Sequence, residues 1–213
     1  MYKKKGARVA GVGVNDADYV IVKREGKKEV WICPFYAAWR NMLNRVYSGR
    51  YKNYLDCSVC DEWLLFSNFK SWMEVQNHQG LHLDKDIKIQ GSKTYSPQTC
   101  AFVPARLNSL LSLSSNSKGE EPVGVCFRKD MASRPYQSYC NSFETDKRTH
   151  LGYFQTAEEA HKEWQISKAD QILKAVFWYE QQGCYTCSVA EALRGRVVKL
   201  IQQSLRGEET TEI

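Results

Sequence analysis

Residues 80–111, GLHLDKDIKIQGSKTYSPQTCAFVPARLNSLL, carry the pattern that decides the predicted fold. Apolar and polar residues alternate at the start of this stretch, which predicts a strand ending at Asp84. The turn-forming sequences QGSK and YSP indicate a polar loop, and residues 101–103 predict a return strand. Pro104 stands where the first turn of a helix tolerates proline, so Asn108 is expected on a short helix. If these elements close together, a carboxylate and an amide face each other across a small cleft.

This order of elements resembles the ββα-metal, or HNH, nuclease fold. It is similar in particular to a divergent group encoded by bacteriophages, in which LDKDI precedes YSPxTC and a helical Asn. The resemblance implies that Asp84 and Asn108 are metal ligands. Asp86, whose carboxylate also offers oxygen atoms, is a candidate third ligand. It places Lys85 at the position of the general base and Thr99 at that of the Asn that stiffens the loop. The implied activity is cleavage of duplex DNA with Mg²⁺ or Mn²⁺, hard cations that prefer oxygen ligands.

Two residues, Lys85 and His82, are candidates for the general base. Lys85 would have to lose a proton near neutral pH, which requires strong desolvation or a neighbouring cation. His82 lies on the same strand face as Asp84, and imidazole groups titrate near neutral pH in general. The alternative is that Asp84, Lys85 and Asp86 form a structural salt-bridge cluster on an inactive nuclease scaffold.

Three short strand patterns and a helix follow a Ser- and Gly-rich break. The strands are expected in GVCFRK, RPYQSYC and THLGYF. A helix then begins with Thr156 as N-cap and Glu159 three residues later, a capping box. This pattern resembles the three-stranded DNA-binding domain of plant ethylene-response factors, the AP-two type, which also occurs in phage nucleases. The residues that carry the resemblance are Gly124-Val125, Tyr136 to Cys140, Leu151-Gly152-Tyr153-Phe154 and the start of the helix.

In that family the sheet lies in the major groove, an opening about 12 Å wide in which Arg can bridge guanine edges. The resemblance implies that basic, aromatic and polar residues of the sheet and its turns contact double-stranded DNA. By position, these candidates are Arg128, Lys129, Arg134, Tyr136, Ser138, Lys147, Arg148 and His150.

The whole chain is predicted to be an α+β protein built from two modules. Before the HNH-like module, the helix that opens at Pro34 has an apolar stripe, with Arg40 and Arg45 near its other side, where they could reach a phosphate. The predicted parts are a basic tail and hairpin (1–30), the HNH-like module (31–113), a linker (114–121), the sheet-plus-helix module (122–182), and a C-terminal helix with an acidic tail (183–213).

Composition supports a folded protein with a polyanionic partner. The chain has 213 residues, of which 43% are hydrophobic, and a formal net charge of +6. That excess suits DNA without establishing it. No apolar run is long enough to span a membrane and no signal peptide is evident, so we expect a cytoplasmic protein, in the host cytoplasm if it is phage-encoded. The apolar stripe of the last helix, 189–205, either packs back on a module or supports self-association.

Eight cysteines in a chain without a secretion signal favour reduced or metal-bound thiols over disulfides. The spacing of Cys57 and Cys60 suits zinc, and two more cysteines flank the same module. A structural zinc site would use Cys33, Cys57, Cys60 and Cys100. Buried free thiols are the alternative.

The sequence therefore predicts a metal-dependent DNA endonuclease of the free-standing homing type, targeted by its C-terminal module. The alternative from another class is a catalytically inactive, sequence-specific DNA-binding or regulatory protein on an HNH scaffold. A third interpretation is an inhibitor or interaction protein that uses the same folds.

Overall fold

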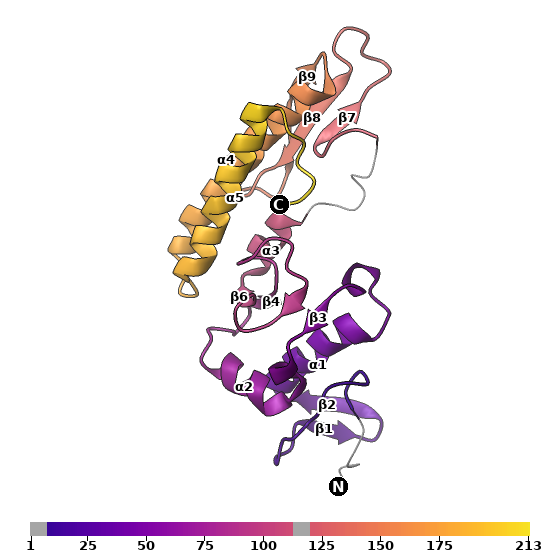
Figure 1. The fold of residues 1–213 in the computed structure, drawn as a ribbon, viewed down its shortest axis with the longest axis vertical. Coiled ribbons are helices and arrows are strands. Elements are labelled where there is room, and N and C mark those ends of the chain that lie inside the picture. The colour runs from indigo at the N-terminus through magenta and orange to yellow at the C-terminus, as the bar shows by residue number, and fades with distance from the viewer. Residues whose placement is uncertain (1–7, 113–119) are drawn as a thin grey trace. The chain divides into compact units, whose positions relative to one another are not determined.

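The protein, seen here in a computed structural model that describes residues 8–112 and 120–213, forms two compact units, Met1–Pro104 and Ala105–Ile213 (Figure 1). The basic start of the chain (1–7) and most of the predicted linker (114–121) lie outside the described residues. Helices and several small sheets occur together, so the predicted α+β class is confirmed. The division at residue 104 assigns the short helix that carries Asn108 to the second unit, although the sequence grouped it with residues 31–113.

The first unit begins with an antiparallel hairpin and is then mainly helical. The hairpin and the helix opened by Pro34 are confirmed. A short 3-10 turn and a second α-helix follow them. Its elements are β1 (Val22–Glu25), β2 (Lys28–Ile32), α1 (Pro34–Tyr47), η1 (Lys52–Tyr54), β3 (Ser58–Val59), η2 (Asp61–Leu64), α2 (Phe66–Glu74), β4 (His82–Asp84), β5 (Thr94–Tyr95) and β6 (Ala101–Val103).

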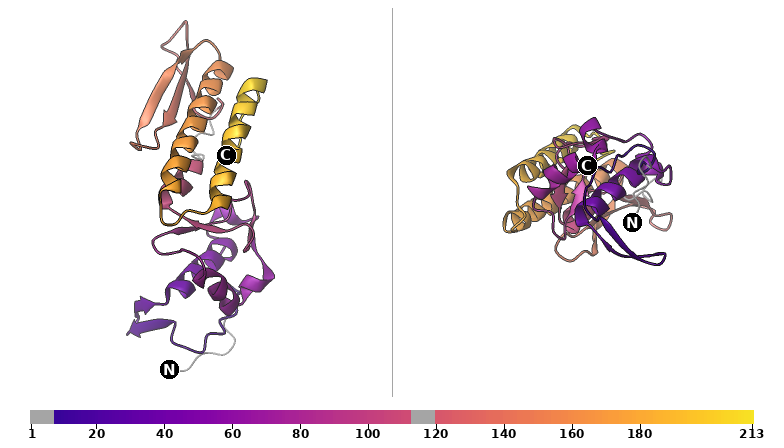
Figure 2. Two further views of the ribbon diagram at one scale, coloured as in Figure 1. Left: turned by 90° about the vertical axis from the view of Figure 1, so that its left-hand side faces the viewer. Right: turned by 90° about the horizontal axis from the view of Figure 1, so that it is seen from below.

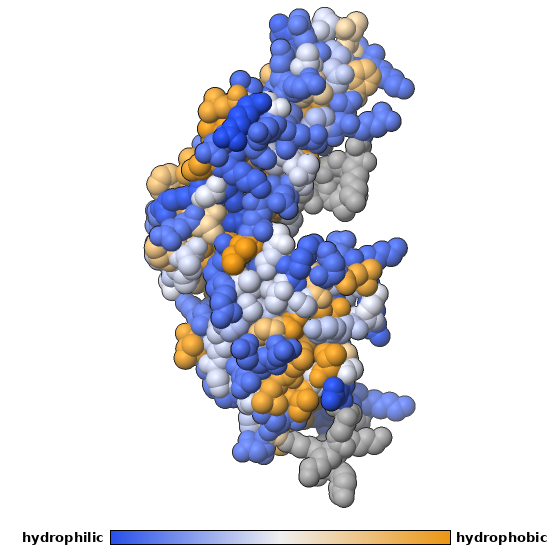
Figure 3. Space-filling view, in the orientation of Figure 1, coloured by the Kyte–Doolittle hydropathy of each residue, from blue (hydrophilic) through white to orange (hydrophobic). Residues whose placement is uncertain are grey.

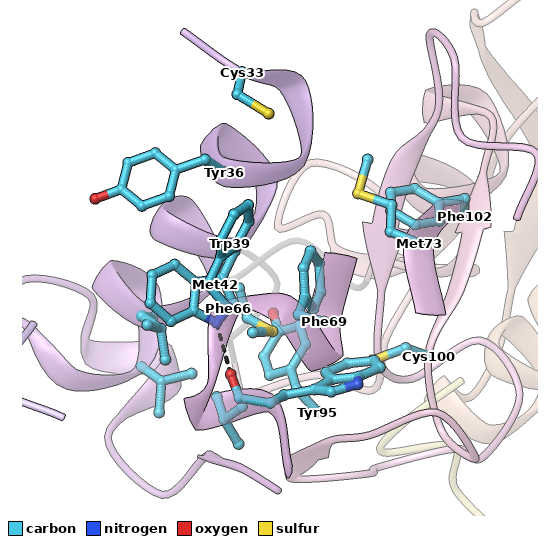
Figure 4. Packing of buried hydrophobic residues seen from close by; sticks show 14 of the residues in the cluster. Cys33, Tyr36, Trp39, Met42, Phe66, Phe69, Met73, Tyr95, Cys100 and Phe102 are labelled. Atoms are coloured by element: carbon cyan, nitrogen blue, oxygen red, sulfur yellow. Dashed lines mark hydrogen bonds between the residues drawn. The ribbon is translucent and has the colours of Figure 1, made fainter. Parts of the chain in front are cut away.

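Aromatic side chains of α1, η2 and α2 fill the core of the first unit (Figure 4). Trp39 is fully buried, and its indole N–H donates to the carbonyl oxygen of Trp63 at 2.6 Å. Phe66 contacts the ring of Trp39, and Trp63 packs edge-to-face on Phe69. Each ring buries a large apolar area, and the indole N–H of Trp39 has a hydrogen-bond partner, which is the usual condition for burying Trp.

Two small strand pairs connect this core to residues 80–104. β4 pairs antiparallel with β6, and β3 pairs parallel with β5. Ile87 is fully buried and Ile89 is about half exposed, but both lie in bends and not in a strand. The segment between β4 and β6 is therefore a long loop, and within it β5 pairs with β3.

The second unit is a three-stranded sheet backed by helices (Figure 2). The three predicted strands and the long helix are confirmed with shifts of a few residues at their ends. The last helix, predicted at 189–205, starts at Cys187, and its N-cap Thr186 makes no side-chain capping bond. The elements are α3 (Ala105–Leu111), β7 (Val125–Phe127), β8 (Tyr136–Asn141), β9 (Arg148–Phe154), α4 (Ala157–Glu180) and α5 (Cys187–Arg206).

The predicted capping box starts α4. The hydroxyl of Thr156 accepts the backbone N–H of Glu159 at 3.2 Å, and the Glu159 carboxylate accepts the N–H of Gln155. Along its length α4 packs against the sheet and against α5, and the views of Figures 1 and 2 agree that the two helices lie side by side. α3 is fixed to the same helix, because the ammonium group of Lys168 donates to the carbonyl of Leu110 at 2.6 Å.

The apolar stripe of α5 faces its own unit. Val189, Leu193 and Leu200 are buried against the chain. Of the two alternatives for this stripe, packing back on a module is therefore the one that these buried residues match. Exposed apolar residues on α5 are Val198 and Leu205, and Figure 3 shows a second unit whose visible surface is mostly hydrophilic with separate apolar patches.

The acidic C-terminal tail is docked, although its composition favours disorder. Thr210 is fully buried, its backbone N–H donates to Nε2 of His161 at 3.0 Å, and its hydroxyl donates to Gln203 at 2.8 Å. The Nδ1 of His161 lies 2.8 Å from the carbonyl oxygen of Val123, so Nδ1 carries the proton of the ring. Nε2 is therefore free to accept the N–H of Thr210. The buried Thr210 thus holds the C-terminal tail in place, although the charged residues of the tail alone predict disorder.

Among the described residues, no helix combines the length and the apolar character that crossing a lipid bilayer requires.

Candidate functional site

The first candidate site begins at the end of β4. In the ladder with β6, His82 lies opposite Val103 and Asp84 lies opposite Ala101. Leu83, between them, packs against the core. Alternate side chains of a strand point to opposite faces, so His82 and Asp84 share the face turned away from that core.

Asp84 organises the loop that follows it. Its Oδ1 accepts the backbone N–H groups of Asp86 at 2.7 Å and Ile87 at 2.6 Å. Burial raises the pKa of the Asp84 carboxyl, although the two N–H donors act in the opposite direction. Its Oδ2 makes no hydrogen bond within the described residues, so one oxygen holds the loop and the other is open to a ligand.

The side chain of Lys85 holds the loop after β4 together in this structure. Its side chain is only 9% exposed, and its ammonium donates to both carboxylate oxygens of Asp86, at 2.6 and 2.8 Å, and to the carbonyl of Ser92 at 2.7 Å. An ammonium has three protons and no lone pair, so all of its hydrogen-bonding capacity is used. This arrangement matches the salt-bridge interpretation for Lys85 and Asp86. His82, the other candidate for the base, is exposed.

Thr99 forms hydrogen bonds within the loop before β6. Its hydroxyl donates to the carbonyl of Thr94 at 2.6 Å and accepts the N–H of Ser96 at 3.1 Å. These two bonds close the turn before β6. A threonine hydroxyl here satisfies the backbone groups of a tight turn.

Asn108 lies on α3, where its side chain is partly buried. Its backbone carbonyl accepts the hydroxyl of Ser112 at 3.1 Å, and its carboxamide makes no hydrogen bond within the described residues. Asp84 belongs to the first unit and Asn108 to the second. Their convergence on one cation stays a prediction.

The four cysteines of the predicted zinc site are in reduced form, and three of them are buried. Burial raises the pKa of the Cys100 thiol to about 12. In the part of the chain that the structure describes, no three His, Cys, Asp or Glu side chains are grouped as metal ligands. The zinc site therefore stays a prediction, with buried thiols as the alternative.

The second candidate site is the face of the sheet that α4 does not cover. Cys140 on β8 contacts α4, since its thiol neighbours Ser167. Alternation along β8 then directs Tyr136 and Ser138 to the same side, and Gln137 and Tyr139 to the opposite, open face. The ladder adds residues of the neighbouring strands to that open face. Its residues are Cys126, Gln137, Tyr139, Asn141, Arg148, His150 and Tyr153, of which Gln137 is itself buried.

Cationic and aromatic groups stack on this open face. The guanidinium of Arg148 lies 4.0 Å from the ring centre of Tyr139. The ring of His150 is 5.4 Å from that of Tyr139 and 4.7 Å from that of Tyr153. The hydroxyl oxygen of Tyr153 accepts a hydrogen bond from the side-chain amide N–H of Gln137 at 2.9 Å. Aromatic rings and polar bonds thus hold the side chains of the face in place.

Arg128 extends the same face beyond the end of β7. Its backbone N–H donates to the carbonyl of Pro135 at 2.7 Å, which continues the ladder. Its guanidinium forms a two-point ion pair with Asp130, with both N–O distances at 3.0 Å. Both partners are exposed, so this pair is open to competition from a phosphate.

The structure places the predicted DNA-contacting residues on both sides of the sheet. Arg128, Arg148 and His150 belong to or extend the open face. Tyr136 and Ser138 point toward α4, and Ser138 is completely buried. The prediction that these two side chains belong to the DNA-contacting face is therefore wrong. Exposed residues of the flanking turns and strand ends are Lys129, Arg134 and Lys147.

Comparison of the chain with protein-family models, with curated proteins and with solved structures found no match.

Sequence reasoning did not select Gln137, Tyr139 and Tyr153 as parts of the open face. The available signal was the alternation in β8, where Gln137, Tyr139 and Asn141 form the more polar set and Cys140 belongs to the other. Polar residues of a sheet packed on one side belong to its free face.

Proposed function

We propose that this chain is a DNA-binding protein that cleaves duplex DNA at a divalent cation held by Asp84 and Asn108, and that the open sheet face of the second unit directs it to DNA. The observation that carries the cleavage proposal is the divided role of Asp84. One oxygen fixes the loop, while the other makes no hydrogen bond within the described residues. A partly buried carboxylate held in place in this way is suited to a cation.

The residues fit Mg²⁺ or Mn²⁺ because both candidate ligands supply oxygen atoms. A bound cation would hold the scissile phosphate and stabilise charge on the leaving oxygen. Asp84 provides the negative charge, and the carboxamide oxygen of Asn108 provides a neutral ligand. His82, on the strand face of Asp84, would accept the proton of the attacking water. Lys85 keeps the loop closed through Asp86 and Ser92.

The DNA-binding proposal rests on the open sheet face. Arg148 stacked on Tyr139 presents a fixed planar cation, which suits phosphate or guanine better than a mobile lysine does. Arg128 and His150 extend the same face. The helix α4 supports the sheet from the other side, so the face can enter a groove without rearrangement of the core.

Supercoiled plasmid incubated with the full chain and Mg²⁺ or Mn²⁺ tests the cleavage proposal. We expect conversion to nicked or linear plasmid that stops when EDTA is added. Tight DNA binding without strand breaks under either ion would contradict cleavage and leave binding intact.

The second candidate function is a regulatory DNA-binding protein without catalysis. It is favoured by one observation: the residue at the base position, Lys85, donates all its protons to Asp86 and Ser92. In this case the loop is a structural element, and His82 has no catalytic task. The plasmid experiment separates the two functions, because only the endonuclease breaks strands.

Substitution Arg148→Ala should weaken binding of a 20-base-pair duplex by about 1–3 kcal/mol and reduce the salt slope by about 1, because a phosphate- or base-contacting cation is lost. Fluorescence anisotropy over a range of salt concentrations measures both. Arg194→Ala is the matched control, because Arg194 pairs with Glu180 on the helices of the same unit. Equal affinities and slopes for the two variants would remove the sheet face from the proposal.

A further inference from the structure

A polar cleft of about 470 Å³ lies in the first unit at the C-terminal end of α1. Its walls come from the last turns of the helix and from the loop that follows. The residues that line it are Asn41, Asn44, Arg45, Ser48, Arg50 and Tyr51, none of which is acidic.

The two arginines of the cleft lack a carboxylate partner. Neither Arg45 nor Arg50 forms an ion pair within the described residues. Arg45 is partly buried, with its guanidinium 5.9 Å from the ring centre of Tyr54 and its Nη1 3.5 Å from the hydroxyl of Tyr95. A partly buried cation with only neutral neighbours is unfavourable unless an anion supplies the missing charge. The cleft is therefore built for a negative ligand.

Arg40 on the same helix shows the contrast. Its Nη1 lies 3.2 Å from both carboxylate oxygens of Glu29. Its charge is compensated inside the protein, whereas the charges of Arg45 and Arg50 are not. The difference between neighbouring arginines of the same unit indicates which of them serve a ligand.

The neutral groups of the cleft specify the kind of anion. Asn41 and Asn44 provide amide donors, and Ser48 provides a hydroxyl that also accepts the backbone N–H of Arg50 at 3.4 Å. Several donors around two planar cations match a tetrahedral oxyanion with many acceptor oxygens. The ring of Tyr51, half exposed at the edge, offers an apolar surface for a sugar or base attached to that anion.

We propose that this cleft binds a phosphate group through Arg45 and Arg50, and that the phosphate belongs to the backbone of the DNA strand offered to the first unit. The second half of this statement rests on the proposed function. Tyr95, which contacts Arg45, belongs to β5 in the loop between β4 and β6. The cleft and Asp84 are thus joined through one loop, so a strand held in the cleft is positioned relative to the candidate cation site.

A free phosphate ester, such as a mononucleotide, has the same chemistry as a backbone phosphate. Two measurements on the full chain distinguish these sources. The first is the affinity and salt slope for a 20-base-pair duplex in EDTA, where cleavage cannot contribute. The second is the shift of the backbone amide signals of Ser48 and Tyr51 on titration with inorganic phosphate and with adenosine monophosphate.

The variants are Arg45→Gln and Arg50→Gln, with Arg40→Gln as the matched control of equal charge change on α1. Arg50 is exposed, so its replacement leaves folding intact even if Arg45→Gln lowers stability. We expect each cleft variant to weaken duplex binding about 5- to 10-fold and to lower the salt slope by about 1, while Arg40→Gln changes affinity less than about twofold.

Each outcome separates the cleft from the wider proposal. If the wild type binds no duplex but phosphate or the mononucleotide shifts the cleft amides, and Arg50→Gln removes the shift, the cleft takes a free phosphate ester and the proposed DNA function fails. If all variants bind duplex equally and no phosphate source shifts the amides, the cleft proposal is overturned while DNA binding through the sheet stands.

Discussion

Asp84→Asn should reduce metal-dependent plasmid nicking by more than about 100-fold while the chain stays folded. The asparagine oxygen can still accept the N–H groups of Asp86 and Ile87, so the loop after β4 keeps its anchor. The negative charge that attracts the cation is lost, and charge stabilisation by a bound metal contributes several kcal/mol to such a reaction. Asn108→Ala should lower nicking in the same direction. Quantified gel assays over a range of Mg²⁺ concentrations measure both.

The stability of these variants distinguishes a lost ligand from a lost fold. Burial raises the folded-state pKa of Asp84 above its unfolded value, so the neutral form is favoured in the folded chain. Ionisation of Asp84 therefore costs stability as the pH rises through the interval between the two pKa values. At neutral pH, Asp84→Asn should be at least as stable as the wild type toward urea. Asp84→Ala, which loses both loop bonds, should be less stable than Asp84→Asn by about 1–3 kcal/mol.

Nicking by Asp84→Asn at the wild-type rate would contradict the role of Asp84 as a ligand. Loss of nicking together with unfolding of Asp84→Asn would show instead that the carboxylate serves the loop alone.

Gly124→Ala should destabilise the second unit by about 2–5 kcal/mol. Gly124 has a φ of +84°, in the region where a side chain costs about 1–2 kcal/mol, and a Cβ there would collide with the indole ring of Trp164. Trp164 is a buried residue of α4, so its ring cannot move without overpacking its neighbours. Amide hydrogen exchange of β8 should become faster, and duplex affinity should fall with the population of folded sheet.

Gly195→Ala is the matched control in the same unit. Gly195 lies within α5, and a Cβ there meets open space. Alanine favours the helix over glycine by about 0.5–1 kcal/mol, so this variant should be slightly more stable than the wild type. Equal exchange protection of β8 in the two variants would contradict the close packing of Gly124 on Trp164.

Individual helices and strands were predictable because the sequence patterns that specify them lie within the elements themselves. Pro34 at the first helical position, the Thr156–Glu159 capping box and the alternation of the three sheet strands each act within a few residues. All three recur in the structure with small shifts at the ends. The strand–loop–strand–helix order of residues 80–111 was accessible for the same reason.

Contacts between distant residues were not predictable. The sequence gives no sign that Lys85 reaches the carbonyl of Ser92, or that Thr210 docks against His161 across 49 positions. The wrong assignment of Ser138 had another cause, since a strand pattern does not say which of its two faces meets the helix. The sequence also does not distinguish the arginines of α1. In the structure, Arg40 forms an ion pair with Glu29, whereas Arg45 contacts tyrosines.

The most direct test of the claim that Asp84 and Asn108 hold one cation is the affinity for Mn²⁺ without DNA, followed by electron paramagnetic resonance. The wild type, Asp84→Asn, Asn108→Ala and the double variant form a double-mutant cycle. We predict one tight Mn²⁺ per chain, a loss of at least about tenfold in each single variant, and a double variant weakened by less than the product of the two losses, because both side chains bind the same ion. Wild-type Mn²⁺ affinity in Asn108→Ala, or losses that simply multiply, would contradict a shared site.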